Sequence, residues 1–228
     1  MGAAVFASGS WPFAAVLFAF FIPAITLSRF GKQRKGALVD VDKRGPRDAR
    51  QVFANGGIAA ACAIGYAFTH SPVFAAAFAG AFAAAAADTW GTELGTLAGA
   101  LPRSILGWRT IPTGLSGGVT LGGTLAEIGG AAFVGLIAWA VGIVPWWMIA
   151  SAGFAGALVD SILGASLQAL HYCPRCARRC ETDPHVCGSA TSLVRGWAWI
   201  DNDAVNALAT LAGAIGAGSL AAVYLTAF

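Results

Sequence analysis

Residues 72–101 read PVFAAAFAGAFAAAAADTWGTELGTLAGAL. This run exceeds the about 20 residues that an α-helix needs to cross a bilayer, and it carries no charge before Asp88. Five more apolar runs of spanning length lie on either side of it: Val5–Leu27, Val52–Thr69, Gly117–Val144, Trp146–Leu170 and Asn202–Phe228. The sequence therefore predicts a single domain over residues 1–228, an all-α transmembrane bundle of about six helices.

The composition agrees with a membrane protein. Of the 228 residues, 57% are apolar and 11% are charged, whereas soluble domains carry about 25% charged residues. The mean hydropathy is +0.69. These values exclude a disordered chain, a basic nucleic-acid-binding domain and a disulfide-stapled secreted module. The bilayer is therefore an expected partner, and nucleic acid is not.

Basic residues fall on only one side of the predicted membrane. All 14 Lys and Arg lie in three alternate connections, and eight of them lie between Arg29 and Arg50. Basic loops stay in the cytoplasm under the positive-inside rule. We therefore expect a multi-pass protein of a bacterial-type cytoplasmic membrane, with cytoplasmic loops at about 29–51, 102–116 and 171–201 and both termini outside.

Acidic residues interrupt the apolar runs. Asp88, Glu93, Glu127 and Asp160 lie inside them, and Asp203 opens the last one. An ionisable group inside the bilayer is costly and marks a functional site by default. All but Glu127 fall near the cytoplasmic ends of their helices. We expect Glu127 nearer the midplane. There it either lines a lipid or proton path or serves as a hydrogen-bonded packing residue.

The polar residues of four helices reach one membrane face at similar depth. Asp88 and Thr92 share a helix face, whereas Glu93 would join Asp88 only if the helix breaks near Gly91. Carboxylate and amide oxygens suit Mg²⁺, which is usually bound by one or two carboxylates together with substrate phosphates. The pattern predicts a metal-phosphate site, and hydrogen bonding between helices is the alternative.

A glycine-rich segment, Ile111-Pro-Thr-Gly-Leu-Ser-Gly-Gly-Val-Thr120, is expected to open the fourth helix. Free N–H groups at a helix N-terminus bind anions, and glycine permits close approach. The upstream Arg103 and Arg109 could clamp phosphate oxygens or serve only as anchors. The predicted phosphate-binding residues are Thr92, Arg103, Arg109, Pro112, Gly114, Gly117, Gly118 and Thr120.

One predicted loop is rich in cysteine. It holds Cys173, Cys176, Cys180 and Cys187, with His185 nearby. A reducing compartment disfavours disulfides, and a C-x2-C pair followed by Cys and His resembles a small zinc knuckle. The predicted structural Zn²⁺ ligands are Cys173, Cys176, Cys187 and either Cys180 or His185. A loop of free thiols is the alternative.

Together the motifs resemble a known family. They are Asp88-Thr-Trp-Gly-Thr-Glu93, the segment from Ile111 to Thr120, Asp160-Ser-Ile-Leu-Gly-Ala-Ser-Leu-Gln168, the Cys-Pro-x-Cys loop and Asp201-Asn-Asp-Ala-Val-Asn206. This set resembles the integral membrane family that includes transmembrane protein 19 and the chloroplast phytyl-phosphate kinase of vitamin E synthesis. The resemblance runs from about Phe30 to the C-terminus.

The resemblance implies a prenyl-phosphate kinase, which converts a phytyl- or geranylgeranyl-like polyprenyl monophosphate to its diphosphate with a nucleoside triphosphate (CTP or ATP) and Mg²⁺. Asp88, Asp160 and Asp203 are then the expected Mg²⁺ ligands. Asn202 and Asn206 would assist them, Glu93 would be a further ligand or orient the site, and the Gly114–Thr120 turn would cradle phosphate. The alternatives are a cytidylyltransferase that joins CTP to a lipid phosphate, and a prenyl-phosphate transporter or flippase.

Overall fold

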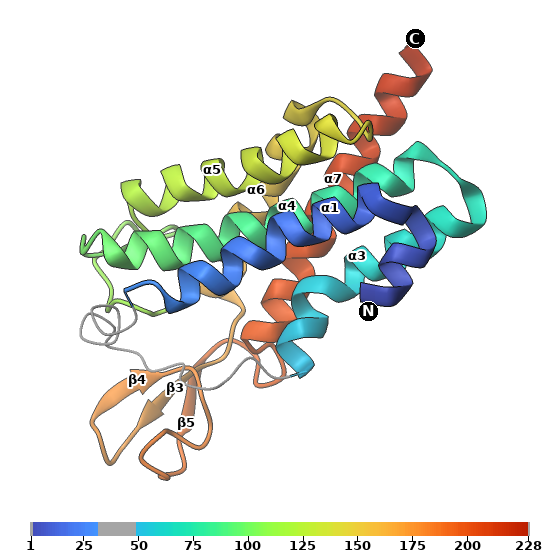
Figure 1. The fold of residues 1–228 in the computed structure, drawn as a ribbon. Coiled ribbons are helices and arrows are strands. Elements are labelled where there is room, and N and C mark those ends of the chain that lie inside the picture. Colours follow the sequence, from blue (N-terminus) through green and yellow to red (C-terminus); the bar gives the residue numbers. More distant parts are fainter. Residues whose placement is uncertain (1, 32–48, 228) are drawn as a thin grey trace.

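The computed structural model describes residues 2–31 and 49–227. Within these ranges, six helices are long and apolar enough to cross a membrane (Figure 1). They are α1 (Gly2–Arg29), α3 (Ala49–Thr69), α4 (Pro72–Leu97), α5 (Leu121–Ala140), α6 (Trp146–Ser166) and α7 (Asn202–Ala227). The predicted six-helix membrane bundle is confirmed. Most of the predicted loop 29–51 lies outside the described residues.

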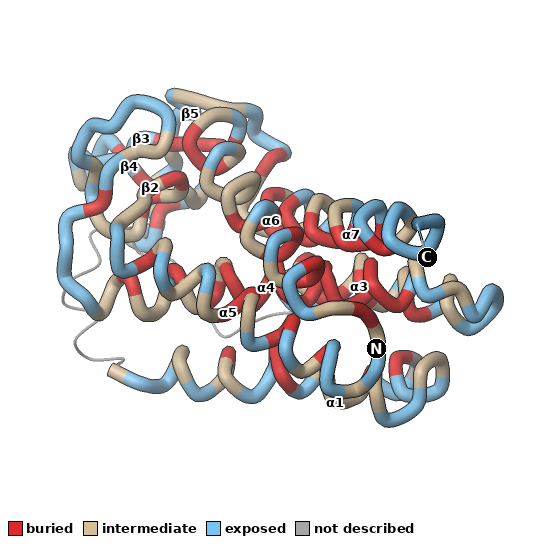
Figure 2. The backbone as a smooth tube through the Cα atoms, turned by 90° about the horizontal axis from the view of Figure 1, so that it is seen from above, coloured by how far each residue is buried: buried red, intermediate tan, exposed pale blue. Residues whose placement is uncertain are grey.

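Helix α4 is the centre of the bundle, and its alanine-rich first half is almost entirely buried (Figure 2). Small residues let the neighbouring helices approach closely. A Cβ at Gly156 of α6 would lie 2.6 Å from Cβ of Ala84 in α4 and 2.8 Å from the carbonyl oxygen of Ala209 in α7. The backbones of α4, α6 and α7 are therefore in direct contact at this level.

Helix α1 differs from the uninterrupted helix predicted for Val5–Leu27. Ser10 has φ 55° and ψ −148°, which breaks the helix. Residues 2–9 fold back along the later part, since a Cβ at Gly2 would lie 3.9 Å from Leu17, whereas fifteen residues of straight helix would span about 22 Å. Figure 1 accordingly shows the N-terminus beside α3 and the C-terminus at the far end of α7. The location of both termini outside the cytoplasm stays a prediction.

Four helix ends also fall short of the prediction. Helix α4 ends at Leu97, α5 begins at Leu121 and ends at Ala140, and α6 ends at Ser166, each four residues short of the apolar run. Gly99, with φ 71°, turns the chain out of α4. The residues between α4 and α5 form a hairpin in which β1 (Arg103–Ser104) pairs with β2 (Gly118–Val119). Apolar composition therefore continued past the true helix ends into connections 98–120 and 167–201.

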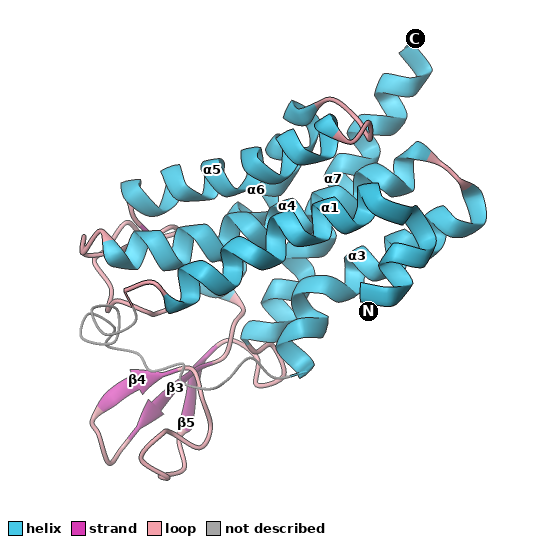
Figure 3. Cartoon of the chain, in the orientation of Figure 1, coloured by secondary structure: helices cyan, strands magenta, loops and turns pink. Residues whose placement is uncertain are grey.

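Connection 167–201, between α6 and α7, folds into an antiparallel sheet of order β4-β3-β5 (Figure 3). Its strands are β3 (Leu170–Cys173), β4 (Arg178–Cys180) and β5 (Ser192–Arg195). This sheet lies at one end of the bundle. The β1–β2 hairpin lies at the same end, because it joins the end of α4 to the start of α5. We call this end, where α4 and α6 finish and α5 and α7 begin, the loop end. Neither sheet was predicted from the sequence.

Candidate functional site

Helix packing brings the acidic residues of α4 and α6 to one level. Ala84, Gly156 and Ala209 meet where the three helices touch. One turn nearer the loop end, the same helix faces carry Asp88, Asp160 and Asn206. The Asn206 side chain is 7% exposed, and both carboxylates are half-buried. Three of the predicted site residues, from three helices, are therefore brought together.

The glycine-rich turn lies one helical turn from this level, on its loop-end side. Gly164 is one turn beyond Asp160 on α6, and a Cβ there would lie 2.9 Å from the amide nitrogen of Gly117. Gly114 and Gly117 have φ of 93° and 81°, the left-handed region that favours glycine. The turn is therefore held against α6 next to Asp160.

The predicted helix N-terminus at this turn was wrong. Gly118 lies in β2, and α5 begins only after Thr120, whose hydroxyl accepts a hydrogen bond of 3.0 Å from Gly123 N–H. Pairing of β2 with β1 takes up the residues that the apolar run assigned to the helix. Any anion held here is therefore bound by turn and side-chain donors rather than by the end of α5.

A carboxylate from the cysteine-rich connection occupies the turn. Oε1 of Glu181 accepts a 2.6 Å hydrogen bond from the Ser116 amide. Its Oε2 accepts bonds of 2.9 Å from the Ser116 hydroxyl and from the Gln168 amide group. The Gln168 side chain is only 2% exposed. Three donors from two separate connections thus converge on one negative charge.

Arg195 adds a cation to this group of donors. Its Nη2 donates a 2.7 Å hydrogen bond to the carbonyl oxygen of Gly164. Burial lowers the pKa of the Arg195 guanidinium, and the nearby Glu181 carboxylate opposes this shift. Ser116, Gln168 and Arg195 therefore surround the Glu181 carboxylate, and we call these four residues the carboxylate nest.

Glu181 and Arg195 were not assigned to the site from the sequence, and they carried no motif signal. Ser116 lies within the Gly114–Thr120 turn that was expected to cradle phosphate, and Gln168 ends the quoted motif that begins at Asp160. Glu181 meets Ser116 across 65 residues of chain, and Arg195 is placed by the pairing of β5 with Leu170. Only the folding of the connections reveals them.

Arg103 and Arg109 lie on the β1 hairpin with exposed side chains. Arg103 donates a 3.1 Å hydrogen bond to the Trp108 carbonyl oxygen. The backbone of Arg109 bonds to Ser104 at 2.9 Å. The cation that the structure places beside the glycine-rich turn is Arg195, and the role of these two arginines as a phosphate clamp stays a prediction. Pro112 begins the same turn.

The acidic residue that lies near Asp88 is Glu127 of α5, and not Glu93 of α4. The helix runs unbroken through Gly91, so Thr92 shares a face with Asp88 and Glu93 points elsewhere. A Cβ at Gly91 would lie 2.8 Å from Oε1 of Glu127, and Glu127 lies within electrostatic range of Asp88. Glu127 therefore lies beside the site of Asp88 and Asp160, and does not form a separate site nearer the midplane.

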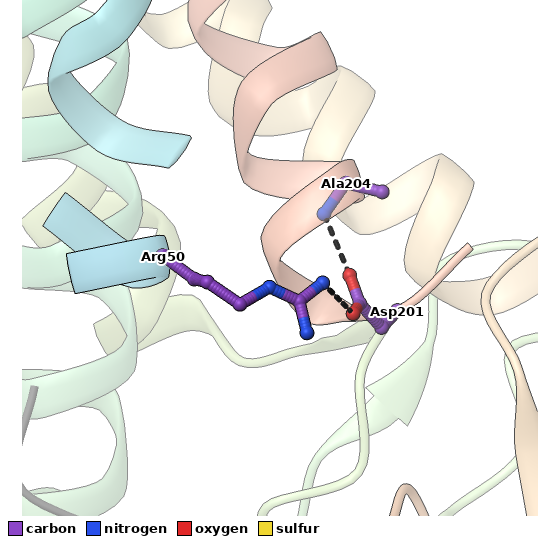
Figure 4. A network of polar contacts seen from close by, with 3 residues as sticks. All are labelled: Arg50, Asp201 and Ala204. Atoms are coloured by element: carbon purple, nitrogen blue, oxygen red, sulfur yellow. Dashed lines mark hydrogen bonds and ion pairs between the residues drawn. The ribbon is translucent and has the colours of Figure 1, made fainter. Parts of the chain in front are cut away.

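The start of α7 is fixed by a cap and an ion pair (Figure 4). Oδ1 of Asp201 accepts a 2.9 Å bond from the Ala204 amide, and Oδ2 lies 2.9 Å from Nη2 of Arg50 in α3. The cap leaves Asn202 and Asp203 in the first turn of α7, loopward of Asn206. The ion pair is solvent-exposed and contributes about 0–1 kcal/mol.

The cysteine-rich connection gathers four candidate metal ligands. The ligand atoms of Cys173, Cys176, His185 and Cys187 all lie within 4.8 Å of one another. A hydrogen bond with His185 lowers the pKa of the Cys187 thiol to about 6. Cys180 is outside this group and donates to the Thr182 carbonyl oxygen at 3.6 Å. Of the two predicted alternatives for the fourth position, the structure places His185 there.

Comparison with known proteins places the chain among membrane proteins. The model of a family described as integral membrane protein DUF92 matches residues 1–214. Protein PGR of Arabidopsis thaliana is 30% identical over 93% of this chain and 82% of its own length.

Two relatives named only as uncharacterized membrane proteins also match. The one from Synechocystis is 25% identical over 94% of this chain and 76% of its own length. The one from Methanocaldococcus jannaschii is 32% identical over 66% of this chain and 63% of its own length. No solved structure matches the chain.

Proposed function

The chain belongs to the DUF92 family of integral membrane proteins, and we propose that it is a prenyl-phosphate kinase with its site at the loop end. The observation that carries the proposal is the meeting of Asp88 and Asp160 with an anion-holding turn at the end of an apolar bundle. Phosphoryl transfer needs positioning and charge neutralisation more than covalent chemistry by the protein. These groups supply both.

The acidic residues fit a divalent cation. Carboxylate and amide oxygens are the ligands Mg²⁺ prefers, together with substrate phosphates. Asp88, Asp160 and Asp203 would hold the ion, with Asn202 and Asn206 beside them. When bound, Mg²⁺ supplies neutralisation of the charge that develops on the transferring phosphoryl group. Glu127 would orient this set from α5.

The carboxylate nest supports phosphate binding. Its donors already hold the negatively charged Glu181 side chain, one turn below Asp160. A substrate phosphate that displaces this carboxylate would receive the Ser116 amide and hydroxyl, the Gln168 amide and the Arg195 guanidinium. Charge-assisted hydrogen bonds of this kind are about twice as strong as neutral ones.

A groove beside α4 is suited to the prenyl chain. It has a volume of about 580 Å³ and lies between α1 and α3, where phenylalanines of α1 and Phe82 line it. Its polar residues are Gln51 and Asn55, at the loop-end start of α3. Phe82 precedes Asp88 by six residues, roughly 9 Å along the helix. The groove therefore lies less than two turns of α4 from Asp88, on a different face of the helix.

We place the loop end in the cytoplasm. The basic residues support this orientation, because all 14 lie in connections on one side of the predicted membrane. A nucleoside triphosphate would then reach the site directly from the cytosol.

The test uses purified protein in detergent with Mg²⁺. Phytyl and geranylgeranyl monophosphates are each offered with ATP, CTP, GTP and UTP, and the products are resolved by mass. The expected products are a prenyl diphosphate and a nucleoside diphosphate, both abolished by a chelator and by Asp88→Asn. A CDP-lipid with pyrophosphate would instead make the protein a cytidylyltransferase. Folded protein that gives no product with any pair would refute both, and flux into liposomes would be measured next.

A further inference from the structure

The four clustered ligands come from the end of β3 and the turn between β3 and β4, and from the loop that follows β4. Cys173 ends β3, and Cys176 lies in the turn that leads to β4. His185 and Cys187 lie in the following loop, where the Gly188 amide donates a 2.7 Å hydrogen bond to the His185 carbonyl oxygen. Cys173 and His185 are buried, and the other two are half-buried. The fold therefore brings the two halves of the motif together within a sheet of short strands.

The separations between ligand atoms match a tetrahedral metal site. Zinc–sulfur bonds of about 2.3 Å and zinc–nitrogen bonds of about 2.0–2.1 Å place two sulfurs about 3.8 Å apart and a sulfur and nitrogen about 3.6 Å apart. The Sγ atoms of Cys173 and Cys187 are 3.6 Å apart, and Cys176 Sγ lies 3.6 Å from Nδ1 of His185. The Nδ1 of His185 is closer, 3.1 Å, to Cys187 Sγ.

A disulfide does not account for this cluster. The sulfurs of Cys173 and Cys187 are 3.6 Å apart, whereas a disulfide bond is about 2.05 Å long. All four cysteines of the connection are free. Three thiols and one imidazole, two of them buried and two half-buried, are the ligand set of structural zinc, which leaves no open position for substrate.

We propose that Cys173, Cys176, His185 and Cys187 bind one structural Zn²⁺ ion, which holds Glu181 in the carboxylate nest. Glu181 directly follows β4 and precedes His185 by four residues, so its backbone lies between the metal-linked parts of the loop. Fixing Cys176 before β4 and His185 after it restrains the Glu181 backbone from both sides. The metal thus fixes the segment whose Glu181 side chain binds the turn at Ser116.

The zinc site does not depend on the reaction proposed above, and its test needs no substrate. Purified protein is analysed for zinc by mass spectrometry, and about one ion per chain is expected. Cys176→Ser and His185→Ala are expected to lower the zinc content at least about tenfold. Cys180→Ser and Cys62→Ser remove thiols outside the cluster and should keep it.

Measurements on the wild-type protein test the proposal even if a variant fails to fold. A mercurial reagent added stepwise should release zinc as the cluster thiols react, and Co²⁺ substitution should give the visible bands of a tetrahedral site. Folded wild-type protein without zinc, which also takes up neither Zn²⁺ nor Co²⁺, would overturn the proposal. Equal loss of zinc in Cys180→Ser and Cys176→Ser would overturn the ligand assignment.

The link to Glu181 has its own measurement. Trypsin can cut at Arg178 and Arg179, which are exposed in β4. Chelation of zinc is expected to speed this cleavage at least about tenfold, because the loop then opens locally. Glu181→Gln should keep full zinc content, because Glu181 is not a ligand. Cleavage that does not respond to zinc removal would show that the metal does not hold this segment.

Discussion

Replacement of Glu181 by alanine should open the loop end without unfolding the bundle. The carboxylate accepts three hydrogen bonds, from the amide and hydroxyl of Ser116 and from Gln168. These partners lie in connections 98–120 and 167–201, not in the membrane-spanning helices. The change should therefore weaken the docking of connection 167–201 on the glycine-rich turn and leave the helices folded.

The expected cost follows from the burial of the donors. Gln168 is 2% exposed, so water cannot replace its lost acceptor, and a buried unsatisfied donor costs about 1–3 kcal/mol. The two donors of Ser116 are part-buried, and water can satisfy them after the change. Loss of the charged acceptor adds about 1.5 kcal/mol. A total of about 3 kcal/mol corresponds to a roughly 150-fold rise in the local opening equilibrium.

Hydrogen exchange measures this opening directly. Suitable reporters are the amides of Ile105 and Trp197, which donate to the carbonyl oxygens of Gly117 and Leu167 at 3.0 Å each. Their exchange should speed up by about two orders of magnitude, while amides in the middle of α4 should not change. Arg178→Gln, which removes an exposed charge from the same hairpin, is the matched control. Reporter exchange within about twofold of wild type would refute the reasoning.

Three further results are expected. Asp160→Asn should lower kcat of the kinase reaction at least about 100-fold, since a metal ligand supplies several kcal/mol of charge stabilisation; normal turnover in a folded variant would remove Asp160 from the site. Arg195→Gln should lower kcat/KM for the lipid phosphate by about 10- to 100-fold through loss of a charged hydrogen bond worth about 1.5–3 kcal/mol, and an unchanged value would mean that Arg195 only supports Gly164. Gly156→Ala should destabilise the bundle by about 1–3 kcal/mol, because its Cβ would meet two helices within 2.6 and 2.8 Å. Thermal unfolding in detergent measures this against Gly57→Ala, whose Cβ would have its nearest neighbour at 3.9 Å, and equal unfolding temperatures would contradict the packing argument.

Hydrophobic length alone was enough to predict the bundle, because each spanning helix must satisfy its own backbone in lipid. The same signal overran the helix ends at Leu97 and Ser166, since connections 98–120 and 167–201 begin with apolar residues. Strands of two to four residues are too short to show a period. The fold-back of α1 at Ser10 has no sequence signal, because serine rarely adopts a positive φ.

The residues of the candidate site that lie in long helices could be predicted from helix periodicity. Asp88, Asp160 and Asn206 were placed correctly at one depth because each lies in a long, regular helix. Whether Glu93 or Glu127 joins them depended on how α4 and α5 pack at Gly91. Glu181 and Arg195 could not be predicted at all, since their partners are set by the tertiary folding of two connections. The choice of His185 over Cys180 likewise required the strand register.

The glycine contacts between α4, α6 and α7 also limit how the protein can move. At Gly156, and at Gly213 against Gly80, backbone touches backbone, so one helix cannot slide or tilt past the next without first moving apart from it. The three helices are therefore expected to move as one rigid unit. A rocking motion that exposes a central site to each side of the membrane in turn would have to separate these helices, whereas movement of connections 98–120 and 167–201 would not. We expect the working motion of this protein to lie in these two connections, at the loop end.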